Sequence, residues 1–245
     1  MPINDTTGEL DGFGGVTAVD AQRVGLISDD HYEDASGRHL PDTVLRAFDG
    51  VDLILHLGHM VDGGGPGDGV LDRLESVAPV LGVQYFTKNE RDEMVLTPLD
   101  GSRVAGLTRV VEAGGMRIGA VHNLGSGPGP QITVPPGGSI PPLDDTDLAA
   151  AVTAKFGGPV DVVAFGGTHR PVALCAHGML FVNPGSPTFP RGPGWQARVP
   201  APGTVGILQL HDGVAAFELV ELTRPGLAAT DSTTTEEARA FGVSP

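Results

Sequence analysis

The chain has 245 residues, a formal net charge of −15 at pH 7 and a pI near 4.7. These values exclude the basic footprint that a nucleic-acid surface or an anionic-membrane surface requires. No run of 18 or more apolar residues and no basic segment ahead of an apolar one is present, so we expect neither a membrane span nor a signal peptide. Cys175 is the single cysteine, which excludes an internal disulfide and makes a cytoplasmic location the expectation.

The length suits one domain with appendages. Gly and Pro number 37 and 21, which indicates long loops, whereas the 40% hydrophobic content indicates a folded core. Residues 1–22 are rich in Gly, Thr and Asp without a sustained period, so we predict a surface or disordered extension there. We predict the folded domain over residues 23–222 and a mobile tail over residues 223–245.

The first half of the chain alternates short apolar runs with helical patterns. The runs at 24–27, 51–57 and 79–86 predict buried strands. Between them, apolar residues at helical spacing predict helices over 40–48 and 70–77. This alternation predicts a largely parallel, doubly wound sheet with right-handed crossovers.

The second half is richer in predicted strands. A hairpin pattern covers residues 108–122, a Gly/Pro/Ser-rich loop covers 125–142, and a helix is predicted over 144–156. A buried strand at 160–165 precedes further segments, which we expect to be mostly antiparallel strands, at 172–176, 179–182, 204–210 and 214–222.

Polar side chains follow several of the predicted strands. Asp29 and His31 come directly after the first strand and, being two residues apart, leave an extended backbone on the same face. Four more residues follow or end other apolar runs, namely His59, Asn89, His122 and His169. Each of them alone is explained by a helix cap or a satisfied polar group. Together they predict a divalent-metal site, because strand ends converge on one crevice and carboxylate and imidazole are metal ligands.

Six motifs carry these residues in a fixed order. They are Ile-Ser-Asp-Asp-His at 27–31, Leu-Gly-His at 57–59, Lys-Asn-Glu at 88–90, Val-His-Asn at 121–123, Gly-Gly-Thr-His-Arg-Pro at 166–171 and Val-Asn-Pro-Gly-Ser-Pro at 182–187. Together they resemble the calcineurin-like metallophosphoesterase superfamily, in particular its small single-domain prokaryotic phosphodiesterases. The resemblance implies an α/β fold, a four-layer αββα sandwich of two mixed β-sheets flanked by helices, with a two-metal centre between the sheet edges.

Several positions depart from the family pattern. Where the family has Gly-Asp, whose carboxylate bridges both metals, this chain has Gly58-His59. An imidazole bridges two metals only as an imidazolate, which holds them farther apart than the roughly 3.5–4 Å of a working pair. Three further family positions are altered, at Glu90, Leu124 and Gly167.

The resemblance therefore implies two unequal metal sites. The good site keeps Asp29, His31 and His169, joined by His59. The second site, which keeps Asn89 and His122, has lost a carboxylate and an imidazole and is expected to be weak or vacant. As a further hypothesis, Asp30 or Asp62 restores an oxygen ligand.

The favoured function is that of a metal-dependent phosphoesterase or phosphodiesterase that uses a metal-activated water. Its cofactor is one or two divalent ions of Mn, Zn or Fe, and its expected partner is a small phosphorylated molecule. Arg91 and Arg170 are candidates for neutralising charge at phosphorus, with solvated side chains as the simpler interpretation. A homo-oligomer through exposed edge strands is a further expectation.

Two alternatives stay open. The first is a non-catalytic binding scaffold, as in the retromer subunit that resembles this family; the lost bridge favours it, and the surviving cluster of desolvated ligands argues against it. The second is a mononuclear, iron-type centre with nonhydrolytic chemistry, because Asp29, His31 and His169 form a set of two histidines and one carboxylate.

Overall fold

The computed structural model describes residues 12–31, 40–61, 67–89, 91–97, 103–125, 127–132, 145–191 and 203–222. Its elements follow the chain in the order β1 (Phe13–Ala18), β2 (Arg23–Ile27), α1 (Asp42–Ala47), β3 (Leu53–His56), α2 (Asp68–Glu75), β4 (Val80–Gly82), β5 (Phe86–Lys88), β6 (Met94–Leu96), β7 (Thr108–Ala113), β8 (Met116–Val121), α3 (Asp145–Phe156), β9 (Val162–Phe165), β10 (Pro171–Ala176), β11 (Met179–Pro184), β12 (Thr204–His211) and β13 (Val214–Glu221).

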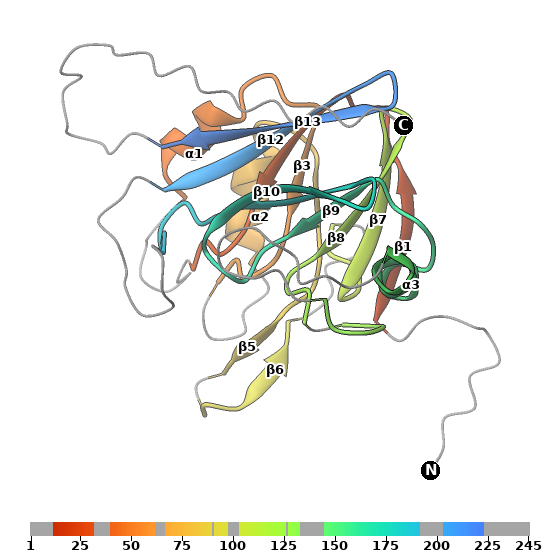
Figure 1. Cartoon of the computed structure of the whole chain (residues 1–245). Coiled ribbons are helices and arrows are strands. Elements are labelled where there is room, and N and C mark those ends of the chain that lie inside the picture. Colours follow the sequence, from red (N-terminus) through yellow and green to blue (C-terminus); the bar gives the residue numbers. More distant parts are fainter. Residues whose placement is uncertain are drawn as a thin grey trace.

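Two mixed sheets form the body of the molecule (Figure 1). One has the strand order β1-β7-β8-β9-β11-β10, and the other has the order β13-β12-β2-β3-β4. Strands β2, β3 and β4 run parallel to one another, as do β8, β9 and β11. Parallel neighbours end at the same edge of a sheet, so the segments after β2 and β3, and those after β8 and β9, leave each sheet together.

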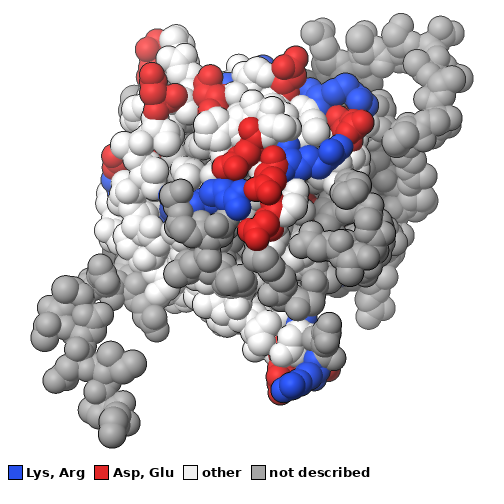
Figure 2. Space-filling view, turned by 180° about the vertical axis from the view of Figure 1, so that it is seen from behind, with Lys and Arg blue, Asp and Glu red and all other residues white. Residues whose placement is uncertain are grey.

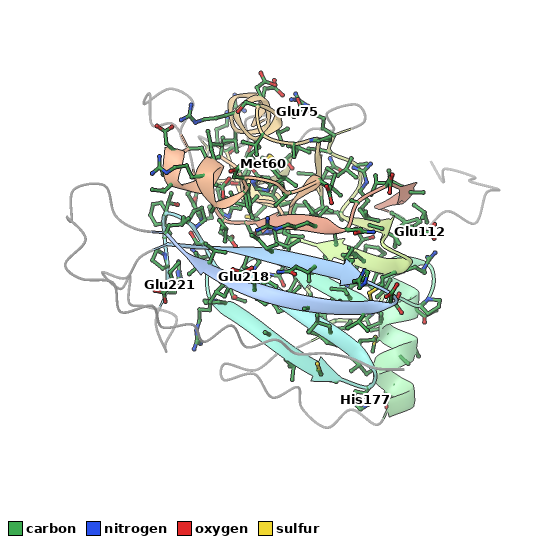
Figure 3. All side chains as sticks on the ribbon, turned by 90° about the horizontal axis from the view of Figure 1, so that it is seen from above. Met60, Glu75, Glu112, His177, Glu218 and Glu221 are labelled. Atoms are coloured by element: carbon green, nitrogen blue, oxygen red, sulfur yellow. The ribbon has the colours of Figure 1, made fainter. Side chains whose placement is uncertain are left out.

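Three apolar clusters define the layers. The central cluster joins residues of both sheets, among them Leu26 from β2 and Ile118 from β8. A second cluster packs α1 and α2 against the outer face of the β2 sheet through Val44 and Leu71, and a third packs α3 against the other sheet through Phe156. Figure 3 shows side chains filling the space between these layers. The two mixed sheets confirm the predicted α/β fold, and the three clusters place its layers in the order helices, sheet, sheet and helix.

Within residues 1–22, where we predict a surface or disordered extension, Phe13–Ala18 form the edge strand β1 parallel to β7. The sequence pattern does not indicate this strand, because two glycines interrupt its apolar residues. At Gly14 a Cβ atom would lie 2.1 Å from the Ala105 carbonyl oxygen, so the close approach of the two backbones requires glycine. Residues 1–11, the tail over 223–245 and most of the loop over 125–142 lie outside the described residues.

The predicted third strand is also shorter than expected. β4 ends at Gly82, and Phe86–Lys88 begins a separate two-stranded sheet with β6. The apolar residues between them lie in a connecting segment whose Gln84 backbone N–H donates to the Gly106 carbonyl. In the second half, β10 pairs with β11 and β12 pairs with β13 in antiparallel fashion, as expected, whereas β9 runs parallel to both of its neighbours.

The charged surface mixes both signs. Arg103 donates to Asp72 at 2.6 Å and to Glu75 at 3.2 Å, and it lies 3.4 Å from Asp68. Figure 2 shows acidic side chains interleaved with Lys and Arg on this side of the molecule rather than a uniform acidic field. No helix within the described ranges is both long enough and apolar enough to cross a bilayer.

Gly25 of β2 tests how tightly the sheet packs against α1. A Cβ atom there would lie 2.7 Å from a ring carbon of Phe48, which is fully buried. We expect Gly25→Ala to lower the free energy of unfolding by about 1–3 kcal/mol, because the ring must shift inside a close-packed core. Urea denaturation measures the loss. Gly158→Ala, whose Cβ would meet nothing closer than 3.5 Å, is the control, and equal losses in both variants would contradict the packing account.

Candidate metal centre

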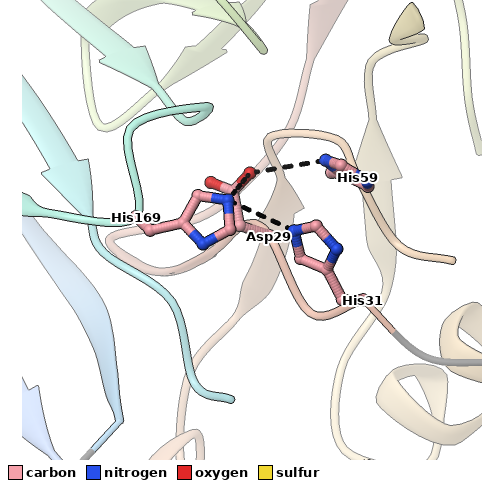
Figure 4. A group of neighbouring side chains, drawn as sticks. All are labelled: Asp29, His31, His59 and His169. Atoms are coloured by element: carbon pink, nitrogen blue, oxygen red, sulfur yellow. Dashed lines mark hydrogen bonds and ion pairs between the residues drawn. The ribbon is translucent and has the colours of Figure 1, made fainter. Parts of the chain in front are cut away.

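Four predicted ligand side chains converge from three loops. Asp29 and His31 follow β2, His59 follows β3 and His169 follows β9. Each offers one potential ligand atom, and these four atoms all lie within 4.8 Å of one another. Figure 4 shows the carboxylate and the three imidazoles gathered around one point. The convergence follows from the topology, because the loops leave the facing sheets at the carboxyl ends of their strands.

The Asp29 carboxylate lies at the centre of this cluster and is fully buried. Its Oδ2 accepts hydrogen bonds from the Gly167 N–H at 2.8 Å and the Ser28 hydroxyl at 2.9 Å. Its Oδ1 has no hydrogen-bond partner among the described residues, although solvent does not reach it. Burying an anionic oxygen without a partner is costly unless a cation lies beside it.

Three imidazole nitrogens face this Oδ1 atom. His169 Nε2 lies at 3.4 Å, His59 Nδ1 at 3.8 Å and His122 Nε2 at 3.9 Å. A carboxylate oxygen surrounded by imidazole nitrogens is a donor set for a borderline divalent ion. The residues therefore fit a cation at this position.

The hydrogen bonds of His169 fix which of its ring nitrogens is a lone-pair donor. Its Nδ1 donates to the Phe189 carbonyl at 3.0 Å, so the neutral ring presents an unprotonated Nε2. His31 Nε2 lies 3.2 Å from that atom. Two nitrogens bound to one ion at about 2.0–2.1 Å are separated by about 2.9–3.4 Å for octahedral to tetrahedral angles. The observed separation suits a shared ion as well as it suits a hydrogen bond.

Backbone strain is concentrated at the same four residues. Asp29, His31, His59 and His169 have φ of 60°, 51°, 58° and 58°, and three other non-glycine residues among those described have positive φ. The left-handed region costs a non-glycine residue on the order of 1–3 kcal/mol and persists where the surroundings enforce it. Here the Asp29 N–H donates to the Gly58 carbonyl at 3.0 Å, which ties the first two loops together. Strain gathered at converging polar side chains is typical of functional sites.

The end of β11 and the turn after it hold two of the cluster's loops in place through hydrogen bonds. The Ser186 hydroxyl donates to the Asp29 carbonyl at 2.8 Å, and the Asn183 side-chain amide donates to the Gly166 carbonyl at 3.1 Å. This segment therefore ties the loop that carries Asp29 to the loop that carries His169.

Removing the Ser186 hydroxyl tests that support. We expect Ser186→Ala to weaken metal binding about 10-fold, because outer contacts orient the ligands that touch a metal. Metal competition against a chelating dye measures the change. Ser76→Ala removes a hydroxyl that caps the end of α2 away from the cluster and serves as the control. Unchanged affinity in the Ser186 variant would show that the turn does not position Asp29.

His122 lies beside the four-residue cluster. Its Nδ1 donates to the Leu57 carbonyl at 2.8 Å, and its ring meets that of His59 edge-on at 5.7 Å between centroids. Burial lowers the pKa of His122, against the opposing effect of the Asp29 carboxylate. Burial likewise lowers the pKa of His169. Both rings therefore remain neutral, as metal ligands must be, further into the acidic range than a free histidine does.

The structure does not bring Asn89 to the cluster. Asn89 lies in the β5–β6 turn, where its Oδ1 accepts from the backbone N–H groups of Arg91 at 2.9 Å and Glu93 at 3.0 Å. Figure 1 shows this hairpin projecting from the sandwich. Because β4 ends at Gly82, the residue that follows the strand at the sheet edge is the buried Val83. Asn89 is thus a turn residue, and Val83 stands at the edge where the prediction placed an amide.

The other predicted residues have mixed outcomes. Arg91 is exposed in the same distant turn, which removes it from the candidate phosphate ligands. Arg170 is half-buried beside His169, and its role stays a prediction. Asp30 is buried and paired with His56 at 2.8 Å instead of completing a second site. Asp62 and Glu90 lie outside the described residues.

Sequence reasoning missed two aromatic residues and one arginine at the site. The His31 ring lies 4.9 Å from the Phe189 ring, and the His59 ring stacks on Tyr85 at 5.3 Å between centroids. The backbone N–H of Arg191 donates to the His169 carbonyl at 3.1 Å. The positive charge of the Arg191 side chain contributes to lowering the pKa of His169. None of the three lies in a motif, although Phe189 and Arg191 closely follow the Ser186 turn.

Comparison with known protein families shows to which superfamily the chain belongs. The family model described as the calcineurin-like phosphoesterase superfamily domain matches residues 23–213. The chain belongs to this superfamily. The match covers the elements from β2 to β12 and all four residues of the cluster.

Relatives with related sequences carry consistent names. A probable metallophosphoesterase of Methanothermobacter thermautotrophicus is 31% identical over 168 residues, which are 69% of this chain and 78% of that protein. A probable metallophosphoesterase of Methanocaldococcus jannaschii is 30% identical over 170 residues, which are 69% of this chain and 70% of that protein.

Solved structures of lower identity share the fold. Vps29 of Entamoeba histolytica, crystallised with zinc, is 22% identical and has a TM-score of 0.53, with 83% of this chain and 94% of that chain covered. Vps29 of Chaetomium thermophilum is 21% identical and has a TM-score of 0.54, with 83% and 93% covered. At this identity the likeness extends to the fold alone.

Proposed function

We propose that the protein is a metal-dependent phosphoester hydrolase with one strong metal site, formed by Asp29, His31, His59 and His169. The observation that carries the proposal is the buried Asp29 Oδ1, which has no hydrogen-bond partner in the described part of the chain and has three imidazole nitrogens around it. Membership of the superfamily and the names of the archaeal relatives support hydrolysis of phosphoesters.

The donor set also narrows the class of metal. Three imidazoles and one carboxylate suit Mn, Fe or Zn better than Mg or Ca, which prefer oxygen ligands. A bound divalent ion of this class would polarise a phosphoryl oxygen and lower the pKa of a water molecule. The protein residues around the ligands provide the rest of the site.

These surrounding residues have separate roles. Phe189 packs beside the imidazole of His31, and Tyr85 stacks on that of His59. His122 holds a neutral Nε2 beside Asp29, where it can accept a proton from the attacking water or accept a hydrogen bond from the substrate. Arg170, which follows His169 in the chain, and Arg191, whose backbone N–H donates to the His169 carbonyl, are candidate cations for a phosphate group.

A second ion would find few ligands. Of the positions that the family uses, His59 replaces the bridging carboxylate, Val83 follows β4 and Gly167 replaces a histidine, which leaves His122. One imidazole beside an already shared carboxylate holds a divalent ion weakly. The proposed enzyme therefore works with its second site weakened or vacant.

The test is hydrolysis of phosphomonoester and phosphodiester panels by protein reloaded with Mn, Fe or Zn. We expect turnover that requires the metal. Protein that holds the metal at one equivalent without hydrolysing any phosphoester would favour the nonhydrolytic, mononuclear alternative. Protein that neither holds a metal nor gains thermal stability from one would favour the binding scaffold, for which the three replaced ligand positions argue.

A further inference from the structure

One further carboxylate and one further imidazole, those of Asp30 and His56, lie next to the cluster without belonging to it. Asp30 and His56 are both fully inaccessible to solvent. His56 Nε2 and Asp30 Oδ2 are 2.8 Å apart. A fully buried polar pair is expensive to maintain, so a specific reason for its presence is expected.

The hydrogen bonds of His56 run toward the metal cluster. Its Nδ1 accepts from the Gly58 backbone N–H at 3.1 Å, which means that Nδ1 carries no proton. The proton of the neutral ring is therefore on Nε2, where it is donated to Asp30. Asp30 thus fixes the tautomer in which His56 can hold the Gly58 N–H.

The turn held in this way is the one that presents His59. Gly58 and His59 both have positive φ, at 91° and 58°. A turn with two consecutive left-handed residues, one of them a histidine, needs external hydrogen bonds to persist. The His56 ring supplies one of these bonds at Gly58 N, and the Asp29 N–H supplies another at Gly58 O, at 3.0 Å.

We propose that Asp30 and His56 are positioning residues that hold the Gly58–His59 turn so that the His59 imidazole serves as a metal ligand. This inference rests on the proposed metal site and assigns Asp30 a role outside the coordination shell. It explains why the metal-binding motif of this chain contains a carboxylate, at Asp30, that lies away from the four ligand atoms. The chain of contacts runs from Asp30 through His56 and Gly58 to His59.

Two replacements of His56 test its contact with Gly58 and its contact with Asp30 separately. The side-chain oxygen in His56→Asn can take the place of Nδ1 and keep the Gly58 contact while losing Asp30. The amide in His56→Gln reaches toward the Nε2 position and keeps Asp30 while losing Gly58. We expect cobalt affinity, measured by competition with a chelating dye, to stay within about 3-fold of wild type in the Asn variant and to fall about 10-fold or more in the Gln variant.

A double-mutant cycle then asks whether Asp30 acts through His59. We expect Asp30→Leu to weaken cobalt binding about 10–100-fold in the wild-type background and less than about 2-fold when His59 is already alanine. The visible spectrum of bound cobalt in Asp30→Leu should shift toward that of His59→Ala, which a merely structural role would not cause. Asp30→Asn, whose oxygen can still accept from His56, should recover most of the affinity.

Several results would overturn the inference. Equal losses in both backgrounds, or a larger loss in His56→Asn than in His56→Gln, would show that the pair acts on the fold as a whole. Should Asp30→Leu fail to fold, the two His56 variants decide the question. Failure of the proposed function is distinguishable, because wild-type protein would then bind no cobalt, or bind it without hydrolysing phosphoesters, before any variant is compared.

Discussion

Asp29→Asn is expected to lower metal affinity at least about 100-fold and to remove metal-dependent activity with it. The reason is geometric. If the amide oxygen takes the Oδ1 position, the NH₂ group faces the Gly167 N–H and the Ser28 hydroxyl, which are donors. If the amide turns over, its NH₂ group faces the imidazole nitrogens and repels a cation. Neither orientation restores the ligand.

The measurement is thermal unfolding with and without metal. In wild-type protein, metal at 100 times its Kd adds about 2.7 kcal/mol to the free energy of unfolding, and in Asp29→Asn we expect this increment to vanish. Asp161→Asn is the matched control. Asp161 also accepts a hydrogen bond from a backbone N–H, that of Arg117 at 2.7 Å, but it lies outside the cluster. A metal increment that survives in Asp29→Asn would place the ion elsewhere.

His59→Ala is the second large effect that we expect. If His59 is a ligand, its loss should weaken the first equivalent of metal about 10–100-fold and leave the stoichiometry unchanged, because the remaining three ligands still meet at one point. Calorimetric titration with zinc or manganese gives both numbers in one experiment.

The control for His59 is His211→Ala, which removes an exposed histidine of the β12 end. If His59 pointed away from the ion, its replacement would leave the first equivalent as tight as in wild type. That outcome would also remove the basis for a positioning role of Asp30 and His56.

The four-residue cluster could be predicted from the sequence for a physical reason. Asp29, His31, His59 and His169 lie just after short, largely apolar runs, and buried parallel strands produce such runs. The carboxyl ends of those strands then converge whatever the loop sequences are. Local patterns therefore predicted a long-range arrangement.

The position at which a strand ends inside an apolar stretch could not be predicted from the sequence. β4 ends at Gly82, but the chain stays apolar through Phe86, so the pattern placed Asn89 at the sheet edge. The edge strand β1 was missed for the opposite reason, since a glycine-rich strand that pairs with only one neighbour has a weak apolar signal. The aromatic neighbours Tyr85 and Phe189 reach the site through tertiary folding, which no local spacing records.

Elemental analysis of the purified full-length chain, combined with titration of metal into chelator-treated protein, tests the central claim most directly. We predict one tightly bound equivalent of Mn, Fe or Zn per chain, with any second equivalent at least about 100-fold weaker because of its poor ligand set. Two equally tight equivalents, or none, would contradict an ion held by Asp29 and its three histidines.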